Sequence, residues 1–280
     1  MRSGLKLAKW AAAWAGGVAI VALLAISIRS IENRFIYFPP QHSRGFAPAK
    51  QYGFPAEEVW LAAADGVKLN ALYLPHPPSR KVILWFHGNA EDLGSALSRL
   101  KFYSATGVNV LALDYRGYGK SEGSPFEEGL YRDADAAYAY LVEQRHVPPE
   151  DIVLLGQSLG GVVAIDLASR RDCGGLIVES SLTTAREMAR RILRIPLVGY
   201  TPRTRFDSLS KIARVRAPVL IVHGTEDGVI PFSMGQRLFE NAPQPKAFYA
   251  VEGAGHNNLL EIAGETYRER LRDFIASTSL

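Results

Sequence analysis

One serine in this chain stands in a pattern that favours nucleophilic chemistry. The run Gly-Gln-Ser-Leu-Gly at 156–160 follows a short apolar stretch, 151–155, and precedes a second one with helical periodicity, 162–168. Gly-x-Ser-x-Gly between a strand and a helix is typical of a nucleophile elbow, a tight turn that presents the serine hydroxyl at the top of a sheet. Such a hydroxyl can attack a carbonyl carbon when a base lies beside it. Ser158 is therefore the candidate nucleophile.

A serine nucleophile needs a histidine base, and the order of residues along the chain narrows the choice. In sheets with this kind of elbow the partners follow the serine as acid and then histidine. Of the six histidines, only His223 and His256 come after Ser158. His223 stands at the end of an apolar strand, whereas His256 follows a glycine-containing turn after the last predicted strand. Loops at the carboxyl ends of strands carry the chemistry of such sheets, so we predict His256 as the base.

The acid that orients the histidine is expected at the end of the preceding strand. Asp227 follows the apolar run 219–222 closely and is our candidate, with Glu226 as the alternative. A carboxylate there would hold the imidazole in the required tautomer and stabilise its charged form. Taken alone, Asp227 fits a turn or a helix cap equally well. Its place in order between the serine and the histidine favours the catalytic role.

An oxyanion hole requires two backbone N–H groups near the serine. Leu159 supplies one from the elbow, and the second is expected from the loop after the third strand. That loop contains Gly88 and Asn89, and we predict the Asn89 N–H as the second donor. Donors of this kind stabilise the charge that develops on the reacting oxygen. His87 precedes the serine in the chain and lies on this loop, so it is interpreted as a structural residue.

The elements that must position these residues follow an alternating pattern from residue 57 onward. Apolar strands alternate with helical periodicity, which predicts an α/β fold: a mostly parallel sheet of about eight strands with helices on both faces. Asp65-Gly66 indicates a hairpin that forms an antiparallel edge. The predicted strands are 59–63, 69–74, 82–86, 108–113, 152–155, 176–179, 219–222 and 247–251, and the predicted helices include 93–105, 130–144 and 261–276.

The N-terminal segment is apolar enough to enter a bilayer. Trp10 to Ile28 contains no charged residue, and a helix of that length spans roughly 28 Å, close to the hydrocarbon thickness of a membrane. Arg2, Lys6 and Lys9 precede it, which favours a cytoplasmic N-terminus and a catalytic domain on the outer side, periplasmic in a bacterium. An uncleaved signal-anchor is favoured, and the alternatives are a cleaved signal peptide or a buried helix.

These patterns divide the chain into an anchor at 1–29, a juxtamembrane connector at 30–56 and an α/β domain at 57–280. A short lid is expected at about 182–217. Residues 186–216 contain nine Arg or Lys against Glu187 and Asp207, and apolar residues recur there at helical spacing. This pattern fits a basic amphipathic helix that contacts anionic lipid or an anionic substrate. It also fits an ordinary helix whose apolar stripe covers the mouth of the site while its arginines face solvent.

Composition excludes several classes of function. The formal net charge is +4, and the first 35 residues account for it, so the remainder is close to neutral and nucleic-acid binding is not indicated. The single Cys173 excludes an intrachain disulfide framework and a cysteine-rich metal site. No metal and no organic cofactor are expected.

Taken together, the motifs resemble the α/β-hydrolase superfamily. They are His-Gly-Asn at 87–89, Asp-Tyr-Arg-Gly-Tyr-Gly-Lys-Ser at 114–121, the elbow, His-Gly-x-x-Asp at 223–227 and Gly-His at 255–256. With the N-terminal apolar segment and the run Glu-Asn-Arg-Phe-Ile-Tyr-Phe-Pro at 32–39, the chain is similar to the membrane-anchored branch that includes lysophospholipid lipases and acyl-protein depalmitoylases. The resemblance implies that Asp114 and Arg116 shape the turn after the fourth strand, and that Tyr115 could line the pocket.

The resemblance and the residues together predict a membrane-anchored serine hydrolase. Its substrate would be a carboxylic ester or thioester, a small molecule or a lipid with an acyl chain. The alternatives are an amidase or peptidase that uses the same triad, and a non-catalytic binding protein on an inherited fold. Neither substrate-contacting residues nor an oligomeric state is predicted.

Overall fold

The computed structural model describes residues 32–40, 55–193 and 203–278. The chain divides into two compact units, Met1–Phe38 and Pro39–Leu280. In the first unit, residues 32–36 are helical, and the predicted anchor at 1–29 lies outside the described residues. No helix among the residues that the structure describes has the length and apolarity needed to cross a bilayer.

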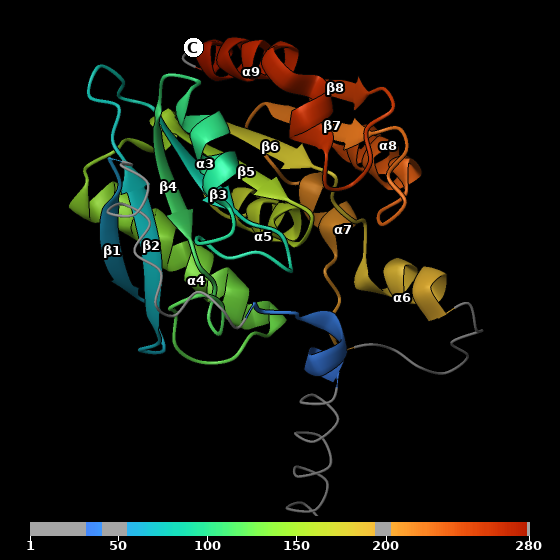
Figure 1. Ribbon diagram of the computed structural model, residues 1–280, viewed down its shortest axis with the longest axis horizontal. Coiled ribbons are helices and arrows are strands. Elements are labelled where there is room, and N and C mark those ends of the chain that lie inside the picture. Colours follow the sequence, from blue (N-terminus) through green and yellow to red (C-terminus); the bar gives the residue numbers. More distant parts are fainter. Residues whose placement is uncertain (1–31, 41–54, 194–202, 279–280) are drawn as a thin grey trace, which may run out of the picture. The chain divides into compact units, whose positions relative to one another are not determined.

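The second unit is built on one sheet of eight strands in the order β1-β2-β4-β3-β5-β6-β7-β8 (Figure 1). β1 pairs antiparallel with β2, and β2 pairs antiparallel with β4, while all other neighbours are parallel. The predicted eight-stranded, mostly parallel sheet with an antiparallel edge is thus confirmed. The strands are β1 (Glu57–Ala62), β2 (Lys68–Leu74), β3 (Val82–Phe86), β4 (Asn109–Leu113), β5 (Ile152–Gln157), β6 (Gly175–Glu179), β7 (Val219–Gly224) and β8 (Lys246–Val251).

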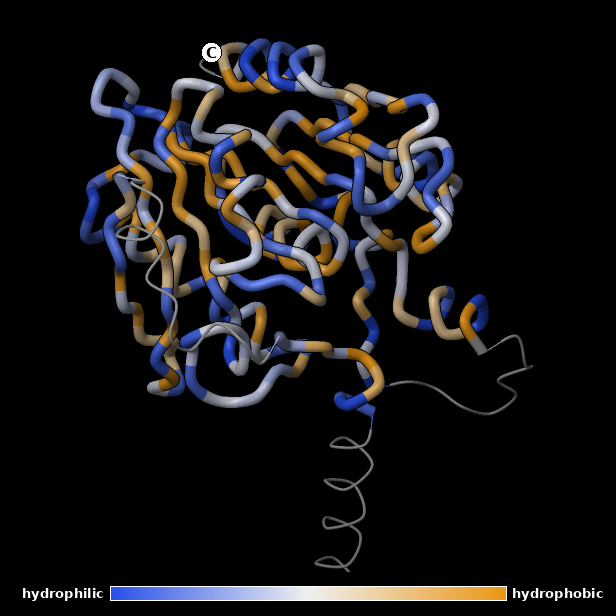
Figure 2. Tube along the Cα trace, in the orientation of Figure 1, coloured by the Kyte–Doolittle hydropathy of each residue, from blue (hydrophilic) through white to orange (hydrophobic). Residues whose placement is uncertain are grey.

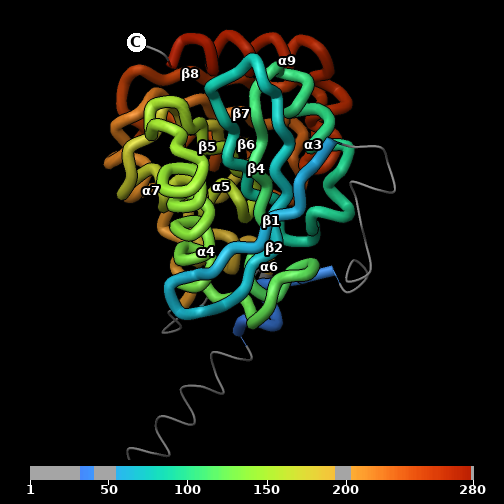
Figure 3. Tube along the Cα trace, turned by 90° about the vertical axis from the view of Figure 1, so that its left-hand side faces the viewer, coloured from blue at the N-terminus to red at the C-terminus, as the bar shows by residue number. Residues whose placement is uncertain are grey.

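Helices cover both faces of the sheet (Figure 3). On one face lie α4 (Glu127–Ala139), α5 (Leu159–Ala168) and α7 (Ser208–Ile212), with α8 (Phe232–Asn241) packed against α7. On the other face α3 (Leu97–Ser104) packs against α9 (Leu259–Ser277). α6 (Ala185–Leu193) follows β6 and begins the region predicted as a lid.

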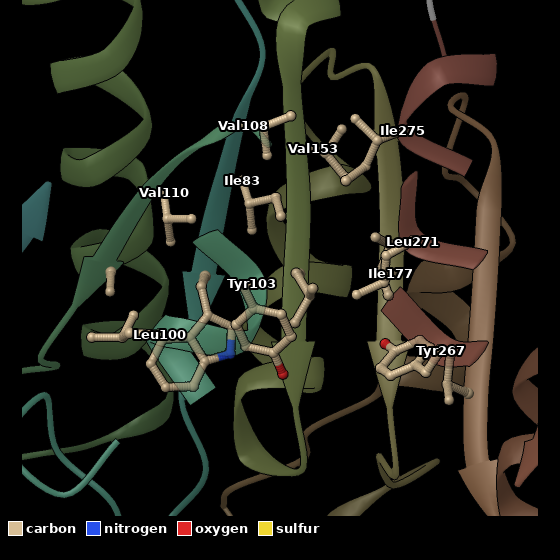
Figure 4. Close-up of a cluster of buried hydrophobic side chains, with 14 of the residues drawn as sticks. Ile83, Leu100, Tyr103, Val108, Val110, Val153, Ile177, Tyr267, Leu271 and Ile275 are labelled. Atoms are coloured by element: carbon tan, nitrogen blue, oxygen red, sulfur yellow. The ribbon is translucent and has the colours of Figure 1, made fainter. Parts of the chain in front are cut away.

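The core lies between the sheet and these helices because the central strands are apolar along their whole length. All five residues of β3 and of β4 are buried, as expected for strands covered on both faces. Along the chain trace, apolar residues gather in the sheet and polar residues in the surface loops (Figure 2). On the α3 and α9 face, Tyr103 and Tyr267 pack with Ile83 and Ile177 of the strands (Figure 4).

Two of the predicted helices begin three or four residues away from their predicted starts. The helix predicted at 93–105 begins at Leu97, and residues 93–96 before it form a turn in which Asp92 accepts a hydrogen bond from the Ser95 N–H at 2.8 Å. The helix predicted at 130–144 begins three residues earlier, at Glu127. It changes at Tyr140–Gln144 into a π-helical turn.

The turn after β4 is held by ion pairs of the buried Arg116, one to the buried Asp133 and one to the exposed Asp65. The Arg116 guanidinium binds Asp133 of α4 at 2.8 Å and Asp65 of the β1–β2 hairpin at 2.8 Å. Asp114 accepts a hydrogen bond from the Leu93 N–H at 2.9 Å. These contacts support the structural interpretation of Asp114 and Arg116, since both carboxylate and guanidinium are satisfied within the fold.

Candidate active site

The backbone at Ser158 has the geometry of a nucleophile elbow. Ser158 lies between β5 and α5 with a φ of 56°, a left-handed conformation that is uncommon for any residue except glycine. The turn is so tight that a Cβ at Gly156 would overlap the Gly160 backbone, and a Cβ at Gly160 would overlap the carbonyl oxygen of Phe86. Only glycine fits at these two positions, which explains the spacing of the motif.

The neighbouring strand holds this strained turn in place. The Ser158 N–H donates to the Glu179 carbonyl at 2.9 Å, and the Ser181 hydroxyl donates to the Ser158 carbonyl at 2.8 Å. Both partners lie at the carboxyl end of β6 or directly after it. Strained backbone of this kind persists only where its surroundings over-determine it, and the end of β6 supplies that constraint.

The three predicted side chains lie in contact with one another. Nε2 of His256 is 3.1 Å from Oγ of Ser158, and Nδ1 of His256 is 2.8 Å from Oδ2 of Asp227. His256 comes from the loop after β8 and Asp227 from the loop after β7, so three loops at the carboxyl edge of the sheet converge. This geometry matches a nucleophile, a base within hydrogen-bond reach and a third group that orients the base.

Asp227 is held as an ionised acceptor. Its Oδ1 accepts hydrogen bonds from the backbone N–H groups of Val229 and Ile230 at 2.9 and 2.8 Å. Burial of the carboxylate opposes ionisation, but hydrogen bonds from His223 and His256 outweigh it and hold the pKa of Asp227 well below its ordinary value. Glu226, the alternative acid, is exposed, and no described contact joins it to His256.

A second histidine faces the same carboxylate. The fully buried His223 places Nε2 3.4 Å from Oδ2 of Asp227 and 3.0 Å from the carbonyl oxygen of Ile230. Its Nδ1 has no hydrogen-bond partner among the described residues. The sequence indicates His223 only as an alternative base. The signal that would have identified its position is the spacing His-x-x-x-Asp, which brings the two side chains together across the turn after β7.

The predicted oxyanion donors lie on two segments that pack closely. Leu159 is the first residue of α5, so its N–H has no acceptor within the helix. Asn89 lies on the loop after β3, and that loop is held against the elbow. A Cβ at Gly160 would also overlap the His87 carbonyl, and one at Gly88 would contact the Gln157 side chain. The loop and the elbow can therefore present their N–H groups to one small volume beside Ser158.

Two buried tyrosines support the oxyanion loop, and no pattern in the sequence indicates this role for either of them. The Tyr118 hydroxyl donates to Oδ1 of Asn89 at 2.6 Å, and the Tyr115 hydroxyl donates to the His87 carbonyl at 2.9 Å. Both side chains are fully buried, so Tyr115 lies beneath the loop and does not line a pocket as the resemblance had suggested. His87 is also fully buried, with its ring 4.4 Å from that of Tyr115, in agreement with its structural interpretation.

A buried acidic cluster lies behind the elbow. Glu179 accepts hydrogen bonds from the hydroxyls of Tyr103, at 2.9 Å, and Tyr267, at 2.5 Å. Burial raises the pKa of Glu179 above its ordinary value, although the nearby Arg99 guanidinium partly opposes this. Arg99 in turn binds Glu91, whose other oxygen accepts the Gly88 N–H at 3.3 Å. The cluster therefore reaches from the nucleophile's backbone partner to the oxyanion loop.

Other reactive groups in the described part of the chain do not form a competing centre. Burial raises the pKa of the Cys173 thiol to about 12, which leaves it un-ionised at neutral pH. No group of three or more His, Cys, Asp or Glu side chains within the described ranges could hold a metal ion.

Comparison of the sequence with known proteins identifies the family of the chain. Residues 77–200 match a family model described as serine aminopeptidase, S33. The chain is 40% identical over 220 residues to α/β hydrolase domain-containing protein 17B of Xenopus laevis, which covers 75% of this chain and 72% of that protein. The chain belongs to the α/β-hydrolase superfamily. It is also 35% identical over 275 residues to the uncharacterised protein Rv2307c of Mycobacterium tuberculosis, covering 94% of this chain and 95% of that one.

Other relatives are longer or more distant. The chain is 43% identical to mouse α/β hydrolase domain-containing protein 17C over 204 residues, 71% of this chain, and spans 61% of the mouse protein. Among solved structures, an esterase of Pyrococcus furiosus superposes with a TM-score of 0.72 at 20% identity over 86% of this chain and 96% of the esterase. At that identity the likeness establishes the fold of this α/β-hydrolase, not its substrate.

Proposed function

We propose that this α/β-hydrolase is a membrane-anchored serine hydrolase that cleaves carboxylic esters or thioesters. The observation that carries the proposal is the unbroken hydrogen-bond chain from Asp227 through His256 to Ser158, with distances of 2.8 and 3.1 Å. A serine that only stabilises the fold needs no base beside it. The alignment of a carboxylate, an imidazole and a hydroxyl on a strained turn therefore supports catalysis.

In the proposed mechanism each residue has one role. Oγ of Ser158 attacks the acyl carbonyl carbon while Nε2 of His256 takes the hydroxyl proton. Asp227 stabilises the resulting imidazolium, and the N–H groups of Leu159 and Asn89 bind the oxyanion. His256 then gives its proton to the departing alcohol or thiol, which leaves an acyl-enzyme. Water, deprotonated by the same imidazole, attacks this ester, and the acid product departs as Ser158 recovers its proton.

A fluorophosphonate probe tests the nucleophile directly, since it reacts with activated serines. The full chain is expected to be labelled, and Ser158→Ala is expected to lose the label completely. A matched control is Ser169→Ala, which removes a hydroxyl at the far end of α5, where Ser169 donates to the Asp166 carbonyl at 2.7 Å. Absence of labelling in folded wild-type protein would contradict the proposed catalysis and favour a non-catalytic binding protein.

Amide or peptide hydrolysis is the second candidate, and the matching family model, described as serine aminopeptidase, favours it. Both reactions share the acyl-enzyme, so the substrate panel must separate them. Nitrophenyl esters and acyl thioesters of several chain lengths should be compared with aminoacyl anilides. We expect kcat/KM for esters and thioesters to exceed that for anilides; the reverse order would establish the peptidase.

The proposed anchor rests on the sequence alone. The uncharged run from Trp10 to Ile28 supports a membrane-spanning helix, with the catalytic unit on the non-cytoplasmic side. The full chain should stay in the membrane fraction after alkaline carbonate extraction, whereas removal of residues 1–29 should release it. Release of the full chain by carbonate would contradict the anchor, and protection of the catalytic unit from an external protease in intact cells would contradict the topology.

A further inference from the structure

The helix that follows β6 carries an unusual density of unpaired positive charge. Arg186, Arg190 and Arg191 of α6 are all exposed, and none of the three forms an ion pair with another described residue. Most other exposed arginines of the described chain are paired, as in Arg171 with Asp135. Arg190 also lies near Glu187 and helps to lower the pKa of that carboxyl, but together the three guanidinium groups on one nine-residue helix make a local positive surface.

Among the described residues, α6 is held to the catalytic unit through the side chain of Glu187 and through the Ala185 N–H, which donates to the Arg205 carbonyl at 2.8 Å. Glu187 accepts hydrogen bonds from Arg237 of α8, at 2.7 and 2.9 Å, and from the Thr183 hydroxyl. Figure 1 shows the helix beyond the end of β6, outside the layers that cover the sheet. Glu187 thus marks the side of the helix that faces the protein.

The opposite side of the helix is apolar and partly exposed, with Met188 and Ala189 half-buried. At about 100° per residue, Met188, Ala189 and Ile192 lie on the side away from Glu187. Ile192 is 69% exposed, the second highest value among the exposed large apolar side chains of the described residues. Arg186 and Arg191 flank this stripe on its two sides. The exposure of Ile192 favours the first of the two interpretations of the sequence, a basic amphipathic helix that contacts anionic lipid or an anionic substrate.

We infer that α6 is an interfacial helix that binds the surface of an anionic lipid bilayer. Exposed apolar residues flanked by arginines are the arrangement of helices that lie in the plane of a membrane, with the apolar stripe among the acyl chains and the guanidinium groups at the phosphates. A soluble anion would be recognised by the arginines alone and would give no reason for the exposed Ile192. The charge complementarity and the apolar stripe together therefore specify a lipid surface.

The position of α6 gives this contact a functional consequence. Only three residues separate Ser181, which binds the Ser158 carbonyl, from the start of α6 at Ala185. A bilayer bound by α6 therefore lies next to the loop that supports the proposed nucleophile. Substrates that partition into that bilayer would be delivered to the site, which deepens the proposed function and rests on it, although the lipid contact itself does not.

A fluorescent label on the apolar stripe tests the contact without any need for catalysis. The full chain with Cys173→Ser, Ser158→Ala and Ile192→Cys carries one thiol, to which an environment-sensitive fluorophore is attached. The protein is reconstituted into vesicles of phosphatidylcholine, with or without phosphatidylglycerol. In anionic vesicles we expect a blue-shifted emission and quenching by nitroxide-labelled lipid, both weakened by added salt.

Matched variants separate the charge from the apolar contact. Replacing Arg186, Arg190 and Arg191 by Gln should lower the ratio of bound to free helix on the order of 100-fold, since each basic residue contributes to attraction at an anionic surface. Removing equal charge elsewhere, with Lys101, Arg270 and Arg272 changed to Gln, should leave the signal unchanged. As a further control, a fluorophore attached at position 269 on α9, in place of position 192, should keep a water-like emission in both kinds of vesicle. Thermal unfolding checks that each variant is folded.

Two outcomes would overturn the inference. A water-like emission at position 192 in both kinds of vesicle would show that the stripe faces solvent. The second outcome is an equal blue shift and equal quenching in neutral and anionic vesicles, both unchanged when the three arginines are replaced. This would show that charge recognition plays no part. Because the protein tested carries Ser158→Ala, neither result depends on hydrolysis, and failure of the fluorophosphonate test would leave the lipid contact unaffected.

Discussion

Nε2 of His223 lies 3.4 Å from Oδ2 of Asp227, the same oxygen that Nδ1 of His256 approaches at 2.8 Å. The acid of the proposed relay therefore sits between two imidazoles, one fully buried and one facing the serine. Nε2 of His223 also lies 3.0 Å from the Ile230 carbonyl, so a proton on Nε2 faces both acceptors and can help to hold the carboxylate against the turn after β7. We interpret His223 as a positioning residue that acts through Asp227.

His223→Leu should therefore lower kcat about 10-fold at unchanged KM, because a hydrogen bond to a charged group is worth about 1.5 kcal/mol. His223→Gln, which keeps an N–H donor, should retain more activity. Phe232→Leu disturbs packing on the edge of the same ring, at a centroid distance of 5.9 Å, but leaves the hydrogen bond. If all three variants lost stability equally with no change in kcat, His223 would be a packing residue only.

The contact between Tyr118 and Asn89 yields a second prediction. Tyr118→Phe removes the hydroxyl that donates to the Asn89 side chain. The Asn89 N–H, the proposed oxyanion donor, should then be less well positioned. We expect kcat and kcat/KM to fall together, by about 10-fold, as for loss of an interaction made in the transition state. Tyr138→Phe is the control, since its hydroxyl donates to the Asp172 carbonyl at 2.6 Å, away from the oxyanion loop. Equal effects of the two changes would refute a role for Tyr118 in positioning.

Much of this architecture could be read from local sequence. The alternation of apolar strands with helices gave the sheet, and the elbow motif gave the position of Ser158, because both depend on residues close together in the chain. His256 and Asp227 were found by their order after the serine, which reflects the topology of parallel sheets. The exact ends of the helices were less predictable: α3 begins at Leu97, after a turn at 93–96 in which Asp92 and Ser95 are hydrogen-bonded to each other.

The supporting groups could not be read from sequence because they join distant segments. Tyr103 and Tyr267 meet at Glu179 from positions 76 and 88 residues away. Nothing in the residues around any of the three indicates the others. The same holds for Tyr118 and Asn89, 29 residues apart. Packing of helices on the sheet decides these contacts, so only the three-dimensional structure reveals them.

Close packing of the elbow against the oxyanion loop yields a third prediction. In Gly160→Ala the new methyl group would overlap the carbonyl oxygens of Phe86 and His87, and backbone atoms cannot move aside as a side chain can. We expect loss of fluorophosphonate labelling and a fall in unfolding free energy of about 2 kcal/mol, as for overpacking in a core. Gly228→Ala is the matched control, because no atom lies within 4 Å of its Cβ position. Full labelling of Gly160→Ala would show that the loop is not held as described.

The buried carboxyl behind the elbow yields a prediction for the pH dependence of stability. Burial raises the pKa of Glu179, so its carboxyl stays protonated to a higher pH in the folded protein than in the unfolded chain. In the unfolded chain a glutamate has a pKa of about 4.3. Between these two values the folded state binds more protons, and its free energy of unfolding must fall as the pH rises.

Glu179→Gln removes the titrating carboxyl. The free energy of unfolding of this variant should therefore decrease less steeply with rising pH than that of the wild type. The difference in unfolding free energy between wild type and Glu179→Gln should therefore favour the wild type most at the acid end and shrink as the pH rises through the folded pKa of Glu179. Urea unfolding across the acid to neutral range measures it, with Glu143→Gln as the control at an exposed carboxyl. Parallel curves for wild type and Glu179→Gln would mean that the carboxyl ionises as readily in the fold as in the unfolded chain, so its hydrogen bonds from Tyr103 and Tyr267 would then fully offset the cost of burial.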